Sequence, residues 1–215
     1  MKYRNQIEFE VSGRYALFTD PFSACGGEKC SLPVPTYDAL RGIADSIYRD
    51  SSMRWVVELV RIMEPVRTES MSMKRRRYFA QGYDLSVYTY LKDVRYRVRA
   101  HFEWCDGKPH DTADEHRCYR MAQRALSHGG RFEVYLGART CPAAVRPCSV
   151  YEGEGAYDGS GRVELGFMYH GLDYGERVAP RFHRAVMNDG VIRFPPPSAC
   201  IRSDNHSGDV SYALA

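Results

Sequence analysis

The stretch LKDVRYRVRAHFEW, residues 91–104, decides the fold because its residue types alternate with a period of two. Apolar side chains occupy every second position, at Val94, Tyr96, Val98, Ala100, Phe102 and Trp104. Polar and charged side chains fill the positions between them, at Arg95, Arg97, Arg99, His101 and Glu103. Successive side chains of a β-strand point to opposite faces, so this pattern predicts a strand with one buried face and one cationic face.

The cationic face places three guanidinium groups in a row, at Arg95, Arg97 and Arg99. They repel one another unless something negative lies across them. The surrounding segment 71–100 holds eight basic and two acidic residues, a net charge of +6 in a chain whose total is +3. A local excess of this kind is typical of proteins that bind a polyanion, so we expect a nucleic acid to lie across the row. An ordinary exposed sheet face is the alternative.

Outward from this strand, the pattern predicts two helices and three further strands, with one loop. Strands are expected at Asn5–Val11, Trp55–Ile62 and Phe132–Leu136, helices at Thr36–Tyr48 and Thr112–His128, and a long basic loop at Val66–Tyr83. Thr36 is a candidate N-cap, and Thr112 with Glu115 fits a capping box. Gly129 and Gly130 are expected to end the second helix.

The resulting order is β-α-β-β-α-β, which predicts a ferredoxin-like α+β domain with an antiparallel sheet, as in RNA-recognition modules. Further strands are expected at Arg162–Met168 and Gly190–Phe194. We therefore expect two units: a ferredoxin-like domain over residues 1–140 and a small β-rich domain over residues 141–215. The tail after Ser203 is polar and expected to be loose.

Composition narrows the class of protein. Hydrophobic residues make up 44% and charged residues 27%, and no apolar run is long enough to span a bilayer. Seven cysteines, without a secretory signal at the start, argue against a disulfide framework, and their spacing does not match common zinc sites. These features predict an intracellular protein that does not associate with membranes.

The stretch DEHRCYRM, residues 114–121, gathers side chains capable of acid–base and phosphate chemistry. On a helix, Cys118 falls on the apolar stripe with Met121, whereas His116 and Arg120 lie opposite. Tyr48, near the end of the first helix, sits at the edge of that helix's apolar face. Such a tyrosine commonly just covers a core.

Five segments of the chain resemble one protein family and follow the same order as in that family. They are FEVSGRYALFTDP, GGEKCSLPVPTYDALRGIADSIY, YTYLKDVRYRVRAHFEW, GGRFEVYLGARTC and LGFMYHGLDY. The family is the type I-C (Dvulg subtype) CRISPR-associated protein of Cas family five, subtype d, within the repeat-associated mysterious protein superfamily. The resemblance covers nearly the whole chain.

The resemblance implies an endoribonuclease that cuts precursor CRISPR RNA at the base of each repeat hairpin without a metal or other cofactor. The ribose 2′-OH attacks the adjacent phosphate, which requires a base, a proton donor and positive charge on the phosphorane. The family supplies a tyrosine and a Lys-His pair, which fall here on Tyr48 and on Arg117-Cys118. Arginine holds a phosphate but cannot shuttle protons near neutral pH.

Two residues are candidates for the place of the missing imidazole. Cys118 has a thiol at a helix start, although a cysteine on an apolar stripe usually just packs. His116 lies two positions earlier on the exposed side, where the alternative is a surface histidine near a helix N-cap. Both alternatives stay open at the level of sequence.

The remaining expectations concern RNA contacts and partners. The candidate RNA-binding residues are Lys29, Lys74, Arg75, Arg76, Arg77, Arg95, Arg97, Arg99, Gly129, Gly130 and Arg131. The expected partners are the repeat hairpin, the mature guide RNA and the backbone and large subunits of the Cascade complex, with double-stranded DNA as a further candidate. The resemblance places the protein in the prokaryotic cytoplasm. The alternative functions are a guide 5′-handle-binding Cascade subunit with little cleavage, and a metal-dependent DNA nuclease.

Overall fold

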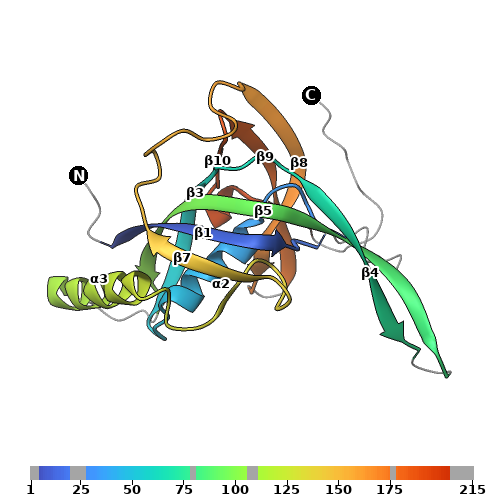
Figure 1. Cartoon of the computed structure of the whole chain (residues 1–215). Coiled ribbons are helices and arrows are strands. Elements are labelled where there is room, and N and C mark those ends of the chain that lie inside the picture. The colour runs from blue at the N-terminus through green and yellow to red at the C-terminus, as the bar shows by residue number, and fades with distance from the viewer. Residues whose placement is uncertain (1–4, 20–27, 78–80, 106–110, 175–177, 204–215) are drawn as a thin grey trace.

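The computed structural model describes residues 5–19, 28–77, 81–105, 111–174 and 178–203. Its centre is β5 (Tyr83–Trp104), which pairs antiparallel with β1 (Gln6–Ala16) on one side and with β3 (Met53–Ile62) on the other. β7 (Pro142–Pro147) pairs with β1, so the order across the central sheet is β3-β5-β1-β7. Figure 1 shows these strands side by side above the two helices.

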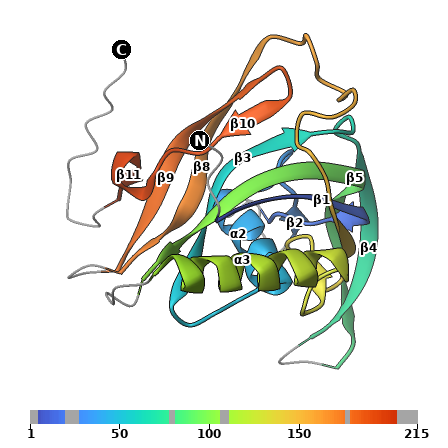
Figure 2. The same ribbon diagram turned by 90° about the vertical axis from the view of Figure 1, so that its left-hand side faces the viewer.

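The predicted alternation in β5 is confirmed. Val94, Tyr96, Val98, Ala100 and Phe102 are all buried, and the residues between them are only partly buried. Helices α2 (Tyr37–Ile47) and α3 (Thr112–Ser127) lie on the same side of the sheet (Figure 2). Their apolar residues, among them Leu40, Ile43 and Leu126, join the buried face of the sheet in one core.

The opposite face of β5 differs from the expectation, because its arginines already have carboxylate partners within the chain. Arg97 Nε lies 2.9 Å from Glu10 Oε2, and Arg99 Nη2 lies 2.8 Å from Glu8 Oε1. Arg95 Nη2 lies 2.6 Å from Glu64 Oε1. The negative charge across the row is therefore the protein's own. The argument that repulsion along the row requires a nucleic acid was therefore wrong, and RNA binding by these arginines stays a prediction.

Backbone from residues 149–158 closes over this same face. Arg97 donates to the carbonyls of Ser149 and Glu152, while Glu8 accepts from the amide of Val150 at 2.9 Å. Arg61 of β3 donates to two further carbonyls of the segment and pairs with Asp158 at 2.6 Å. Buried carbonyls and carboxylates need such donors, so the arginine row serves to hold this segment in place.

The segment Val66–Tyr83 was predicted as a loop, and this was wrong. β4 (Thr68–Arg76) pairs antiparallel with the first part of β5, from Thr68 opposite Leu91 to Arg76 opposite Tyr83. The resulting two-stranded arm projects from the body (Figure 1). Its side chains are mostly exposed, so it lacks the apolar alternation by which a half-buried strand is recognised.

The helix ends follow simple capping chemistry. Thr36 Oγ1 accepts from the amide of Ala39 at 3.3 Å, which confirms the predicted N-cap of α2. The N-cap of α3 is Asp111, whose Oδ1 accepts from the amide of Asp114 at 2.8 Å. The predicted capping box starting at Thr112 was therefore wrong by one residue, since aspartate is an equally good cap.

The remaining strands join this sheet at both of its edges and along β5. They are β2 (Lys29–Cys30), β6 (Val134–Tyr135), β8 (Arg162–Asp173), β9 (Ala179–Asn188), β10 (Val191–Arg193) and β11 (Ile201–Arg202), with a short 3₁₀ helix η1 (Pro197–Ala199). The predicted strand at Phe132–Leu136 is the short β6, and the strand β9 was not predicted. β10 pairs with both β9 and β3, so the C-terminal strands continue the central sheet.

The predicted boundary at residue 140 falls between β6 and β7, which pair with each other. β7 also pairs with β1, so at least this strand belongs structurally with the N-terminal part. The division into domains 1–140 and 141–215 otherwise stays a prediction, and the tail after Ser203 lies outside the described residues. No helix in the described part of the chain is long and apolar enough to cross a membrane.

Replacing Arg97 with methionine is expected to destabilise the fold. Glu10 is only 2% exposed, so loss of one of its two arginine partners leaves a buried carboxylate poorly satisfied, at a cost of about 1–3 kcal/mol. Chemical denaturation measures this loss. The matched control is Arg54→Met, which removes an exposed pair with Glu103 and is expected to cost less than about 1 kcal/mol. Equal losses would contradict the structural role of Arg97.

The same pair predicts a pH dependence of stability. Burial alone would raise the pKa of Glu10, but hydrogen bonds from Arg97 and Arg146 outweigh it and hold that pKa below the ordinary value of 4.5. Such a carboxyl adds stability above its unfolded pKa and loses that contribution as the pH falls through its folded pKa. The difference in unfolding free energy between the wild type and Glu10→Gln is expected to shrink as the pH falls from about 5 to about 3. A difference that stays constant over this range would contradict the prediction.

Candidate active site

Tyr48 is fixed at the end of α2 by backbone contacts. Its amide donates to the carbonyl of Ala44 at 3.1 Å, and its carbonyl accepts from Trp55 Nε1 at 2.7 Å. The Trp55 ring in turn packs edge-to-face on Phe102 of β5, at 5.8 Å between ring centres. The central sheet therefore sets the position from which the Tyr48 side chain reaches α3.

The glycine-containing turn after α3 is attached to the same helix end. The amides of Arg131 and Phe132 donate to carbonyls of the last turn of α2, with Arg131 N 3.0 Å from the Ile47 oxygen. Gly129 and Gly130 adopt φ of 85° and 101°, a left-handed conformation that favours glycine. The predicted helix end is confirmed, and the turn brings Arg131 beside Tyr48.

These elements enclose an open cavity of about 380 Å³ between the end of α2 and the C-terminal half of α3. It is lined by Tyr48, Met121, Arg124, Ala125, His128 and Arg131. The cavity combines a phenol, an imidazole and two guanidinium groups. Such a combination can bind an anion and transfer protons beside it.

The Tyr48 hydroxyl is directed at sulfur atoms of α3. It donates to Met121 Sδ at 3.6 Å, and it lies close enough to Cys118 for each group to shift the pKa of the other. Burial, followed by the effects of Cys118 and Asp50, raises the pKa of Tyr48, so the phenol stays protonated at neutral pH. Thioether sulfur is a weak acceptor, so a phosphate oxygen would compete well for this hydroxyl.

The residues predicted at the start of α3 lie in different surroundings. Cys118 is 2% exposed and belongs to the core, and burial raises the pKa of its thiol. Arg117 is exposed and forms an ion pair with Asp114 at 3.2 Å. His116 is partly buried and, like Arg117, is not among the residues that line the cavity.

His128 was not predicted from the sequence. A histidine immediately before two glycines is typical of a helix end, and His128 is indeed the C-cap of α3. Arg124, which also lines the cavity, was not among the predicted site residues either. Their proximity to Tyr48 depends on the contact between α2 and the turn after α3, which no local pattern reveals.

The basic residues fall into two groups. Arg95, Arg97 and Arg99 are ion-paired, as is Arg77 of the arm with Asp84 at 2.7 Å. In the described part of the chain, by contrast, no carboxylate pairs with Arg120, Arg124, Arg131, Lys74 or Arg76. The Lys29 ammonium group lies 5.6 Å from the centre of the Tyr88 ring. Gly26 and Gly27, which precede Lys29, lie outside the described residues, and so does the side chain of Arg75.

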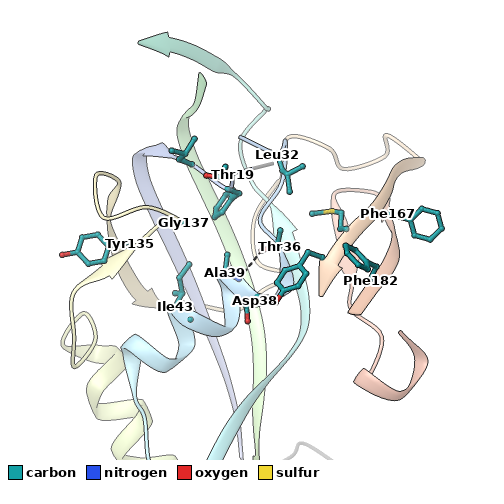
Figure 3. A pocket seen from close by; sticks show the side chains of 15 residues that line it. Thr19, Leu32, Thr36, Asp38, Ala39, Ile43, Tyr135, Gly137, Phe167 and Phe182 are labelled. Atoms are coloured by element: carbon teal, nitrogen blue, oxygen red, sulfur yellow. Dashed lines mark hydrogen bonds between the residues drawn. The ribbon is translucent and has the colours of Figure 1, made fainter. Parts of the chain in front are cut away.

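A second cavity, of about 440 Å³, lies between α2 and the β8–β9 pair (Figure 3). Ile43 of α2 lies on one side of it and Phe182 of β9 on the other. Its lining is mostly apolar. Its carboxylate, Asp38, accepts a hydrogen bond from Arg41 at 2.8 Å. This cavity contains no imidazole, thiol or guanidinium among its lining residues, so it offers little acid–base chemistry. Nor does any group of three metal-binding side chains gather elsewhere within the described ranges.

Comparison with known proteins identifies the family. The sequence profile of the Cas5d family, described as CRISPR-associated protein (Cas_Cas5), matches residues 6–195. A protein of Mannheimia succiniciproducens named CRISPR pre-crRNA endoribonuclease Cas5d is 26% identical over 222 residues, covering 89% of this chain and 96% of that one. A protein of the same name from Thermus thermophilus is 29% identical over 180 residues, covering 80% of this chain and 75% of that one.

Solved structures agree with this assignment. A crystal structure described as a CRISPR-associated protein has a TM-score of 0.76 and 30% identity, and the match covers 93% of this chain and 96% of that one. A functionally uncharacterized protein from Streptococcus mutans has a TM-score of 0.75 at 30% identity. The match of the family profile spans most of the sequence and most of the described fold, and the chain belongs to the Cas5d family of CRISPR-associated proteins.

Proposed function

We propose that this protein is a precursor CRISPR RNA endoribonuclease that cuts its repeat RNA at the base of the hairpin by attack of the ribose 2′-OH, without a metal ion. The observation that carries the proposal is the cavity in which Tyr48, Arg124, His128 and Arg131 converge. Two curated relatives carry the name of this activity, which supports it. The type I-C assignment is part of the same proposal.

In this reaction the 2′-oxygen forms a bond to phosphorus while the bond from phosphorus to the 5′-oxygen breaks. The products are a 2′,3′-cyclic phosphate and a free 5′-hydroxyl, so one proton leaves the 2′-OH and one reaches the 5′-oxygen. The protonated phenol of Tyr48 is suited to donate to the leaving oxygen or to a phosphorane oxygen. Arg124 and Arg131 supply positive charge for the phosphorane. Arg117, which lies outside the cavity lining, remains a candidate for holding a phosphate, as proposed from the sequence.

For the proton acceptor, the sequence offered Cys118 and His116. A buried thiol with a raised pKa is a poor base, which favours a packing role for Cys118. His116 remains a candidate as proposed from the sequence, in the first turn of α3 beside Arg117.

The RNA path proposed here follows the basic groups without carboxylate partners. Arg120, Arg124 and Arg131 lie along α3 and the turn after it, and Lys74 and Arg76 lie on the arm. On the arm, Lys74 is opposite Leu85 and Arg76 opposite Tyr83, so cations and exposed apolar side chains share one face. Such a face suits the phosphates and bases of a hairpin. Arg95, Arg97 and Arg99 are ion-paired within the chain and are not part of this proposed RNA path.

We also propose that the central part of the fold is a ferredoxin-like domain. The antiparallel order β3-β5-β1-β7, with α2 and α3 on one face, is the order expected of a ferredoxin-like domain, with β7 as its fourth strand. We extend the proposal to retention of the cut guide and incorporation into a Cascade complex in the prokaryotic cytoplasm, next to the backbone and large subunits and close to double-stranded DNA.

Cleavage of the repeat RNA in EDTA is the direct test. The wild type is expected to cut under single-turnover conditions, and Tyr48→Phe is expected to cut about 10²-fold more slowly while binding RNA almost as tightly, because only a proton donor is lost. Binding without any cleavage would favour the handle-binding alternative, and cleavage that requires added metal would favour a metal-dependent nuclease. Equal loss of binding and cutting in Tyr48→Phe would remove Tyr48 from the site.

Charge reversal on the arm tests the RNA path. Lys74→Glu with Arg76→Glu is expected to weaken binding and to reduce the slope of log affinity against log salt by about 1–2, since two phosphate contacts are lost. Fluorescence anisotropy over a salt series measures the slope. Arg54→Glu is the matched control, because Arg54 is an exposed residue of β3 opposite Glu103, at the end of β5 far from the arm; it is expected to leave the slope unchanged. An unchanged slope in the arm variant would rule out these two contacts.

A further inference from the structure

His128 lies on the same cavity as Tyr48, at the opposite end of α3 from the residues that the family pattern selects. The residues from His116 to His128 span three helical turns, roughly 18 Å along the axis. Tyr48 contacts the middle of the helix at Met121, and the cavity opens from there toward His128. The two histidines thus stand at opposite ends of α3, and His128 shares the cavity with the phenol.

Hydrogen bonding fixes both the orientation and the tautomer of the His128 ring. Its Nδ1 lies 2.7 Å from the carbonyl oxygen of Arg124. A carbonyl oxygen only accepts, so Nδ1 must carry the proton in this bond. In the neutral ring, Nε2 then has a free lone pair and acts as a proton acceptor. The nearby Ser127 hydroxyl, 3.2 Å from Nδ1, donates to the same carbonyl at 2.8 Å.

The charges around this imidazole suit an RNA phosphate. The cavity lining contains the guanidinium groups of Arg124 and Arg131 and the hydroxyl of Tyr48, and it contains no carboxylate. A phosphodiester held between these two cations would lie between Tyr48 and His128. Arg124, His128 and Arg131 are exposed to solvent, whereas Tyr48, which also lines the cavity, is only 3% exposed.

We propose that His128 is the catalytic proton-transfer group of this chain, and that it takes over the function of the imidazole missing at Cys118. This inference rests on the proposed endoribonuclease function. Nε2 of His128 accepts the proton of the 2′-OH as the 2′-oxygen bonds to phosphorus, and Tyr48 donates a hydrogen bond or a proton to the departing 5′-oxygen. The cavity between them holds the scissile phosphodiester of the repeat RNA.

The test compares single-turnover cleavage of the repeat RNA in EDTA for the wild type, His128→Ala, His128→Asn and His116→Ala. Both His128 variants are expected to cut about 10²- to 10⁴-fold more slowly, with RNA affinity within about threefold of the wild type. Asparagine is the matched replacement, because its amide can still donate to the Arg124 carbonyl and cap the helix but cannot accept the proton. His116→Ala tests the other candidate: a greater loss of cleavage in His116→Ala than in His128→Ala would assign the proton transfer to His116 and overturn the inference.

Added imidazole separates a chemical role from a structural one. His128→Ala leaves space in an open cavity, so millimolar imidazole is expected to restore part of its cleavage and to have no effect on Tyr48→Phe. Cleavage by His128→Ala and His128→Asn at the wild-type rate would overturn the inference while leaving the endoribonuclease function intact. A loss of cleavage in the His128 variants that imidazole does not restore, and that accompanies a lower melting temperature, would also overturn the inference and leave the endoribonuclease function intact. A wild type that binds the repeat RNA but never cuts it would overturn both.

Discussion

The pairing of Glu8 and Glu10 with Arg99 and Arg97 across β1 and β5 is the interaction on which the rest of this structure depends. One face of β5 is apolar and holds the helices, while the other carries charge that must be neutralised if backbone is to cover it. The glutamates provide that neutralisation, and Arg97 also donates to the carbonyls of Ser149 and Glu152. The central sheet is thus covered on both faces, by helices on one side and by an ion-paired segment on the other.

This arrangement decides where charge is left for a ligand. Guanidinium groups that are engaged with carboxylates and carbonyls are unavailable to phosphates, so the net charge of segment 71–100 overstates its capacity to bind RNA. Several basic groups that have no carboxylate partner among the described residues lie instead on α3, on the turn after it and on the arm. The turn is bonded to the last carbonyls of α2, which places its cations beside Tyr48. Fold and proposed chemistry are thereby linked through a few backbone hydrogen bonds.

Much of the fold could be predicted from local pattern. The alternation in β5, the apolar stripe and Thr36 cap of α2, and the glycine end of α3 are all signals carried by neighbouring residues, and the structure confirms them. β4 was missed because a strand with two exposed faces has no such signal. The role of the arginine row was misjudged because its partners lie far away in sequence, with Glu10 87 positions from Arg97. His128 escaped notice for the same reason, since only tertiary contacts bring the end of α3 to Tyr48.

The ribosome synthesises the two parts of this cavity, Tyr48 and the helix α3, at different times. Tyr48 and Met121 are 73 positions apart, and the intervening chain forms most of the central sheet, including all of β5. A nascent chain on the ribosome therefore contains the phenol long before it contains the helix and turn that complete the cavity. Until those residues have emerged and docked, the polypeptide lacks the cavity that we propose for RNA cleavage.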